Sequence, residues 1–182
     1  MEWDIGYDDA VTHAFPPFMK GYDEKARRMG SQYFSSFQGF PGYDVVASEE
    51  RFTVGIGAYR FKGIVDLVLR NKDGLFIVDH KTKSPSSMQR DYSLFRRQLY
   101  IYAQYVKDKY GEYPARLAFN MIKTGKLIDE PFSMAEMKDT VEWAEAIIDE
   151  INMCEDFEAN TSSRCRILCD QRKQCQYFME QV

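Results

Sequence analysis

Two apolar strand segments, each interrupted by one acidic residue and joined by a tight turn, restrict the fold of this chain more than any other feature. The first segment covers residues 63–69 and contains Asp66, and the second covers residues 75–81 and contains Asp79. Residues 71–74 between them read Asn-Lys-Asp-Gly, which is typical of a β-hairpin turn. If the two ends of that turn pair, Asp66 lies directly across from Asp79, whereas other registers shift the pairing by a residue or two.

Both carboxylates stand among apolar neighbours, where a charge costs free energy unless it is paired or holds a metal ion. Lys81 lies two residues beyond Asp79 and therefore points to the same face of the sheet. Gln98 and Tyr102 are about one turn apart on the following helical segment, so both can reach the same strand edge. An Asp-x-Lys in a strand is often a surface ion pair, but the order and spacing of the whole set favour a catalytic site.

The chemistry of this set suits the hydrolysis of a phosphodiester. Carboxylate oxygens are preferred ligands of Mg²⁺ or Mn²⁺, and such an ion makes a water nucleophilic and neutralises phosphate charge. Lys81 would orient or deprotonate the attacking water, or stabilise the charge of the transition state. We therefore interpret Asp66 and Asp79 as metal ligands.

Hydrophobic spacing and turn residues predict the other elements. They are a helix over 18–37, strands over 51–58, 61–69 and 75–81, a helix over 90–110, strands over 115–123 and 126–132, and a helix from Ser133 to about Cys154. This order predicts an α/β fold of the mixed α+β kind, with a central mixed sheet flanked by helices and a Cys-containing C-terminal tail. We expect a single domain over 1–182, divided into a helical lead-in (1–50), a catalytic core (51–132) and a helix with the Cys tail (133–182).

Length and hydropathy favour one cytoplasmic domain. A chain of 182 residues supports one well-formed core. No apolar run approaches the roughly 20 residues of a membrane span, and no signal peptide opens the chain. We expect a protein of the cytoplasm that has no membrane partner.

Basic residues gather near the proposed site although the net charge is −4. Besides Lys81, this group consists of Lys83, Arg90, Arg96 and Arg97. A second group of basic residues lies in the C-terminal tail. Basic residues concentrated at a site matter more for phosphate binding than the overall sum. Each group is either a nucleic-acid contact or an ordinary solvated face.

The three motifs together resemble the PD-(D/E)XK nuclease superfamily, in the RecB-like branch that includes CRISPR-associated RecB-like exonucleases. Residues 63–66 resemble its "GxxD" strand, residues 79–81 its "(D/E)xK" and residues 98–102 its "QxxxY". The resemblance covers residues 50–110 strongly and the tail loosely. It implies a restriction-endonuclease-like fold, a mixed sheet flanked by helices.

The resemblance also assigns roles to residues. Asp66 and Asp79 would bind the metal, joined by the main-chain carbonyl of His80, and Lys81 would be catalytic. Gln98 and Tyr102 would shape the site and contact DNA. Members of the branch often add a histidine from an N-terminal helix. His13 is the candidate here, although it precedes Pro16-Pro17, and an ordinary, partly exposed histidine is the alternative.

Four cysteines occur late in the chain, which in a cytoplasmic protein favours metal binding over disulfides. They are Cys154, Cys165, Cys169 and Cys175. The last three resemble the C-terminal trio that holds a [4Fe–4S] cluster in many relatives. The first spacing is wider than the usual Cys-x-x-Cys, and no cysteine precedes the core, so Cys154 would be a substitute ligand. The set therefore binds an iron–sulfur cluster or Zn²⁺, or remains free thiols.

The resulting hypothesis is a divalent-metal-dependent DNA nuclease, an exonuclease on DNA ends or single strands. The alternatives are a structure-specific endonuclease, a catalytically idle nucleic-acid-binding protein on a nuclease scaffold, and a non-nuclease iron–sulfur or zinc protein. The resemblance suggests a compact, phage-type member in a bacterial or phage-infected cell. Its partners would be DNA and proteins of recombination, repair or CRISPR adaptation.

Overall fold

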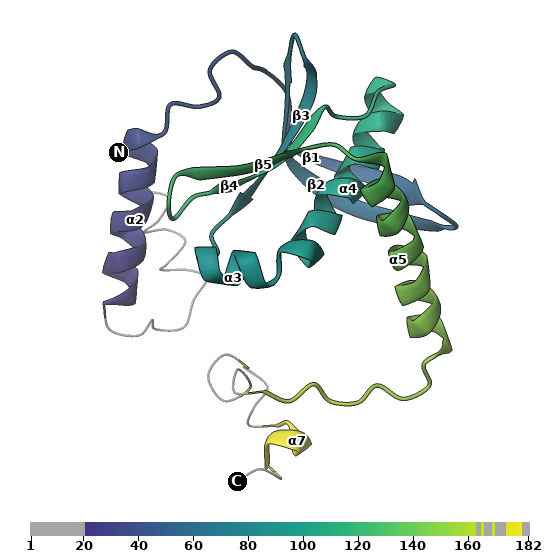
Figure 1. Ribbon diagram of the computed structural model, residues 1–182. Coiled ribbons are helices and arrows are strands. Elements are labelled where there is room, and N and C mark those ends of the chain that lie inside the picture. The colour runs from purple at the N-terminus through teal and green to yellow at the C-terminus, as the bar shows by residue number, and fades with distance from the viewer. Residues whose placement is uncertain (1–20, 163–164, 166–168, 170–173, 180–182) are drawn as a thin grey trace. The chain divides into compact units, whose positions relative to one another are not determined.

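The computed structural model describes residues 21–162, 165, 169 and 174–179 (Figure 1). Contacts divide the chain into two compact units, Met1–Glu145 and Ala146–Val182. The first unit contains the sheet and the helices that pack on it. The expectation of one domain over 1–182 stays a prediction. None of the helices in the described ranges is long and apolar enough to cross a membrane.

The centre of the first unit is a five-stranded sheet in which strand order follows chain order. The strands are β1 (Asp44–Ile56), β2 (Tyr59–Asn71), β3 (Gly74–Lys81), β4 (Arg116–Met121) and β5 (Lys126–Pro131). Neighbouring strands are antiparallel except β3 and β4, which are parallel. A parallel pair needs a long crossover connection, which helices provide here. The predicted mixed sheet flanked by helices is confirmed.

The crossover consists of α3 (Pro85–Arg90) and α4 (Tyr92–Tyr110), which Figure 1 shows between β3 and β4. Ser84 caps α3 by accepting a hydrogen bond from the Ser87 N–H, and Pro85 occupies its first turn. Gly111 ends α4 in the left-handed conformation at φ 81°, which costs glycine little. The predicted helix over 90–110 therefore exists, but it is preceded by a separate short helix.

Three more helices are described: α2 (Tyr22–Ser36), α5 (Met134–Met153) and the short α7 (Gln176–Met179). The predicted capping role of Ser133 is confirmed, because its Oγ accepts the Glu136 N–H at 3.4 Å. The predicted helix over 18–37 corresponds to α2, with residues 18–20 outside the described part.

The central strand β3 is buried on both faces of the sheet, which explains why its sequence is a continuous apolar run. One face packs under α4, and its cluster includes Leu75 and Ile77. The other face carries a smaller cluster with Phe76 and Val78, covered by Phe40 and Tyr43. Because side chains alternate along a strand, Asp79 continues the α4 face of β3. The acidic residue is thus held between the sheet and α4.

Candidate active site

The sheet register brings the two predicted carboxylates together. Asn71 pairs with Gly74, and the antiparallel pairing continues to Leu67 and Val78. The next step of the same register sets Asp66 opposite Asp79. The hairpin prediction made from the turn residues is therefore confirmed.

Where the backbone pairing of β2 and β3 ends, the Asp66 carboxylate provides the next hydrogen bond between the two strands. Its Oδ2 accepts a hydrogen bond from the His80 backbone N–H at 2.8 Å. The His80 imidazole belongs to the opposite face of the sheet, where its Nδ1 is 3.0 Å from Nδ2 of Asn120. Only the main chain of His80 therefore belongs to the face that carries Asp79, in agreement with the proposed role of its carbonyl.

Asp79 is the most buried charged group of the site. Its side chain is 2% exposed, and its Oδ2 lies 2.7 Å from Nζ of Lys81. This contact with the Lys81 ammonium offsets the charge of Oδ2, which has no other hydrogen-bond partner among the described residues. Burial raises the pKa of Asp79, and the ammonium of Lys81 opposes this shift.

Lys81, Gln98 and Tyr102 form a continuous polar chain beside this carboxylate. Nζ of Lys81 donates to Oε1 of Gln98 at 2.9 Å, and Nε2 of Gln98 donates to the Tyr102 hydroxyl. Burial raises the pKa of Tyr102 to about 12, and the charges of Asp79, Asp66 and Glu49 add to the shift. The Tyr102 hydroxyl therefore stays protonated at physiological pH, and Gln98 fixes the position of the lysine ammonium.

A divalent cation fits this arrangement. A buried carboxylate oxygen without a hydrogen bond is costly unless a positive charge faces it. Lys81 meets part of that requirement, and a second carboxylate, Asp66, stands on the neighbouring strand. Hard oxygens of this kind suit Mg²⁺ or Mn²⁺. Within the described ranges, no three His, Cys, Asp or Glu side chains come together as a metal site. A bound ion would depend on two carboxylates, main-chain oxygen and water.

One acidic residue near the site escaped the sequence analysis. Glu49 falls between the pairs Ser48–Leu67 and Glu50–Val65, so it faces Asp66 across β1 and β2. It is the one non-glycine residue with positive φ among the described residues, at 50°. The signal for it was the acidic pair at 49–50, in the middle of β1. Its charge, felt at Tyr102, adds to the negative potential of the site.

The four basic residues predicted to bind nucleic acid have different surroundings. Nζ of Lys83 lies 4.6 Å from the ring centre of Phe95. Arg90 is mostly exposed and pairs with its neighbour Asp91. Arg96 and Arg97 both form ion pairs with carboxylates of other elements. Their role as nucleic-acid contacts stays a prediction.

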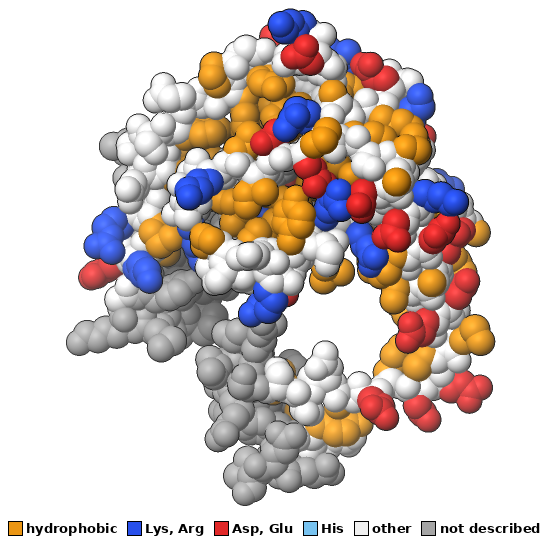
Figure 2. Space-filling model, in the orientation of Figure 1, with side chains coloured by type: hydrophobic (Ala, Val, Ile, Leu, Met, Phe, Trp, Pro, Cys, Tyr) orange, Lys and Arg blue, Asp and Glu red, His pale blue; other side chains and the backbone are white. Residues whose placement is uncertain are grey.

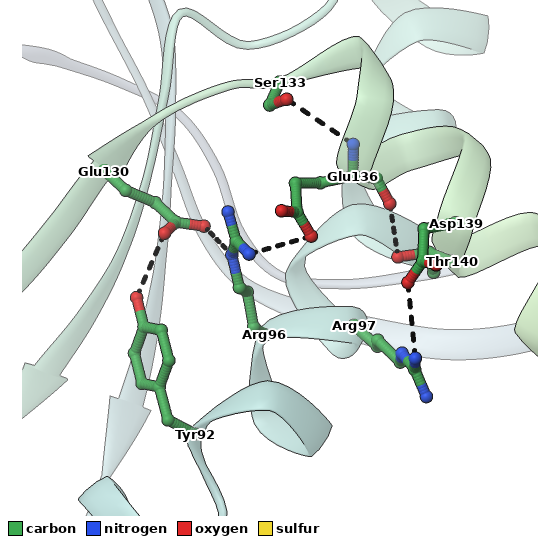
Figure 3. A network of polar contacts seen from close by, with 8 residues as sticks. All are labelled: Tyr92, Arg96, Arg97, Glu130, Ser133, Glu136, Asp139 and Thr140. Carbon is green, nitrogen blue, oxygen red and sulfur yellow. Dashed lines mark hydrogen bonds and ion pairs between the residues drawn. The ribbon is translucent and has the colours of Figure 1, made fainter.

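Arg96 ties α4 to the elements that follow it (Figure 3). Its guanidinium donates to Glu130 of β5 and pairs with Glu136 of α5 at 2.8 Å. Glu130 also accepts the Tyr92 hydroxyl at 3.2 Å. Burial disfavours the guanidinium charge, but the hydrogen bonds to the two glutamates more than offset it and raise the pKa of Arg96. This arginine therefore contributes to the stability of the fold.

We expect Arg96→Met to lower stability by about 1–2 kcal/mol, because it leaves Glu130 and Glu136 without their shared partner. Thermal unfolding should show a loss of roughly 2–8 °C. Arg90→Met is the matched control, because that side chain is mostly exposed and pairs with an adjacent residue. Equal melting temperatures for the two variants would contradict a structural role for Arg96.

The remaining predicted ligands are not assembled in the described part of the chain. His13 lies outside the described residues. Among the described residues the four cysteines form no disulfide, and Cys154 is exposed with its Sγ 2.9 Å from the Asp156 carbonyl oxygen. Segments between the other three are outside the described residues as well. The iron–sulfur or zinc assignment stays a prediction.

Comparison with known proteins identifies the family of this chain. The sequence profile of the PD-(D/E)XK nuclease superfamily matches residues 3–176. The chain therefore belongs to the PD-(D/E)XK nuclease superfamily, a class that indicates metal-dependent nuclease activity. A solved structure described as "Crystal structure of SSO0001" is similar at 17% identity, with 97% of this chain and 79% of that chain covered and a TM-score of 0.44. No curated protein matches the sequence.

Proposed function

We propose that this protein is a divalent-metal-dependent DNA nuclease, an exonuclease that acts on DNA ends or single strands. The observation that carries the proposal is the buried Asp79 carboxylate, whose Oδ2 faces the Lys81 ammonium at 2.7 Å. Burying such a charged pair costs free energy of folding. The cost is explained if the site must bind a cation and a phosphate together. The preference for ends and single strands rests on the RecB-like resemblance.

Each residue then has a role. Asp66 and Asp79, with the His80 carbonyl, would hold Mg²⁺ or Mn²⁺. The bound ion would supply Lewis-acid stabilisation of the phosphate and lower the pKa of an attacking water. Lys81 presents its ammonium to the scissile phosphate or orients that water. Gln98 holds the lysine head in place, and Tyr102, protonated and buried, holds Gln98.

The alternatives differ in measurable ways. A structure-specific endonuclease would use the same groups but produce discrete internal cuts. A catalytically idle nucleic-acid-binding scaffold would not need a buried carboxylate with a lysine positioned by a second residue. The contacts of Lys81 with Asp79 and Gln98 therefore favour a working enzyme.

The cysteine tail belongs to the proposal as a second, separate cofactor site. Cys154, Cys165, Cys169 and Cys175 would hold a [4Fe–4S] cluster or Zn²⁺ and so order the C-terminal tail. Absorbance near 400 nm of the protein as purified, combined with a metal assay, distinguishes cluster, zinc and free thiols. In this proposal the protein works in the cytoplasm of a bacterial or phage-infected cell, with partners in recombination, repair or CRISPR adaptation.

The test of the proposed function is degradation of end-labelled single-stranded and double-stranded DNA with Mg²⁺, with Mn²⁺ and with EDTA. We expect cleavage with either ion and none with EDTA, and a ladder of short products in place of discrete fragments. Circular single-stranded DNA, which has no ends, is the control for exonuclease action. Inactivity with both ions on every substrate would support the idle scaffold.

A further inference from the structure

A pocket of about 350 Å³ opens beside the candidate active site, between β1, β2, α4 and the middle of α5. Gln98 and Tyr102 belong to its lining as well as to the polar chain that ends at Lys81. A molecule in the pocket would therefore lie next to the lysine. Pockets of this size are typical of sites that enclose a small planar group.

The walls of the pocket are mainly apolar and aromatic. Phe61 of β2, Leu94 of α4 and Trp143 of α5 face it, and each is at least partly accessible. The Arg97 guanidinium lies 4.5 Å from the centre of a Trp143 ring, a cation–π contact. A half-buried tryptophan with an arginine at its face is a surface on which another flat ring can stack.

Two cations border this aromatic surface. Lys62 of β2 is exposed, and Arg97 of α4 is 28% exposed with a partner, Asp139, that is itself 63% exposed. Figure 2 shows that acidic side chains follow α5, and Figure 3 shows that Glu136 and Asp139 of this helix turn to the arginines of α4. Asp139 offsets part of the Arg97 charge, but both side chains are accessible to a phosphate, and Lys62 adds an exposed cation at the rim.

We propose that this pocket binds an unpaired base of a single-stranded nucleic acid, stacked on Trp143, with flanking phosphates at Lys62 and Arg97. Aromatic rings beside basic residues form the usual surface for single strands. The pocket adjoins the polar chain that ends at Lys81, so the stacked base belongs to a nucleotide next to the scissile phosphate. The inference rests on the proposed function and adds that a duplex must open before it is cut.

The experiment uses Trp143 as its own reporter. The chain has two tryptophans, so Trp3→Phe in the full-length protein leaves Trp143 as the single emitter. This variant is titrated in EDTA with oligo(dT), with an abasic oligonucleotide of equal length and charge, and with a blunt duplex. We expect quenching by oligo(dT), and roughly 5- to 100-fold weaker binding of the abasic strand and of the duplex.

Variants separate stacking from charge. By polarisation of a labelled oligonucleotide, Trp143→Ala should weaken oligo(dT) binding but leave the abasic strand unaffected. Trp143→Phe should restore most of the affinity, which a loss of folding would not allow. Equal affinity for oligo(dT) and the abasic strand, or tighter binding of the duplex, would overturn the inference. A Trp143-dependent dimer by size-exclusion chromatography would assign the pocket to a second copy and would also overturn it.

The result stays distinct from the test of nuclease activity. Metal-dependent cleavage without quenching of Trp143 fluorescence would refute the proposed base-binding site and support the proposed nuclease activity. Quenching of Trp143 fluorescence without cleavage in Mg²⁺ or Mn²⁺ would support the proposed base-binding site and refute the proposed nuclease activity.

Discussion

Lys81→Ala is expected to lower the rate of DNA cleavage by roughly 10²- to 10⁴-fold, the range for loss of one acid–base or charge-stabilising group. The ammonium lies 2.7 Å from Asp79 and 2.9 Å from Oε1 of Gln98, and the substitution removes both contacts. Single-turnover cleavage of end-labelled DNA with saturating Mg²⁺ measures the loss. Asp79→Ala should abolish cleavage as well, because it removes a proposed metal ligand.

Lys83→Ala is the matched control for Lys81→Ala. Lys83 lies two residues further along the chain and also contacts the ring of Phe95, but it makes no ion pair with Asp79 among the described contacts. We expect its rate at saturating DNA to change less than about tenfold, with any effect in substrate binding. If Lys81→Ala cleaved DNA as fast as Lys83→Ala, the catalytic assignment of Lys81 would be wrong.

Gly63→Ala is expected to destabilise the protein by about 1–3 kcal/mol, because the added methyl group overpacks a filled space. A Cβ at this position would lie 2.5 Å from Cζ of Phe52, its cross-strand partner. The Phe52 ring has little room to move, since it stacks on Tyr105 at 4.6 Å and meets Tyr102 edge-on at 5.6 Å. Thermal unfolding should show a loss of roughly 2–12 °C.

Gly55→Ala is the control for this prediction, because a Cβ there meets nothing within 4 Å. It should leave the melting temperature nearly unchanged or raise it slightly. Gly63→Ala should also slow cleavage, since Phe52 would be pushed toward Tyr102 and through it toward Gln98. A Gly63→Ala protein as stable as Gly55→Ala would show that the Phe52 ring relaxes freely.

The centre of the fold followed from local sequence signals. The turn at residues 71–74 set the register of β2 and β3, and with it the opposition of Asp66 and Asp79. The apolar residues around each acid set the burial of the strands. Gln98 and Tyr102 were correctly paired because helical spacing alone decides which residues share a face.

Features that depend on distant parts of the chain could not be predicted from local sequence signals. β1 begins at Asp44 and not at residue 51, because its first residues are exposed and are held by backbone pairing with β2. The partners of Arg96 come from β5 and α5, so the sequence around Arg96 does not distinguish a structural arginine from a phosphate contact. The sequence around Trp143 did not indicate a binding role, because the pocket that Trp143 lines forms only where α5 approaches α4.

The five proposed catalytic residues all lie on the uninterrupted stretch that runs through β2, β3 and α4. Elements after Gly111 support this stretch from outside: β4 pairs with β3 along Asp79 and Lys81, and Glu130 and Glu136 hold Arg96 of α4. Residues before Asp44 supply none of the five, so changes in that segment should alter the proposed reaction less than changes in β2, β3 or α4.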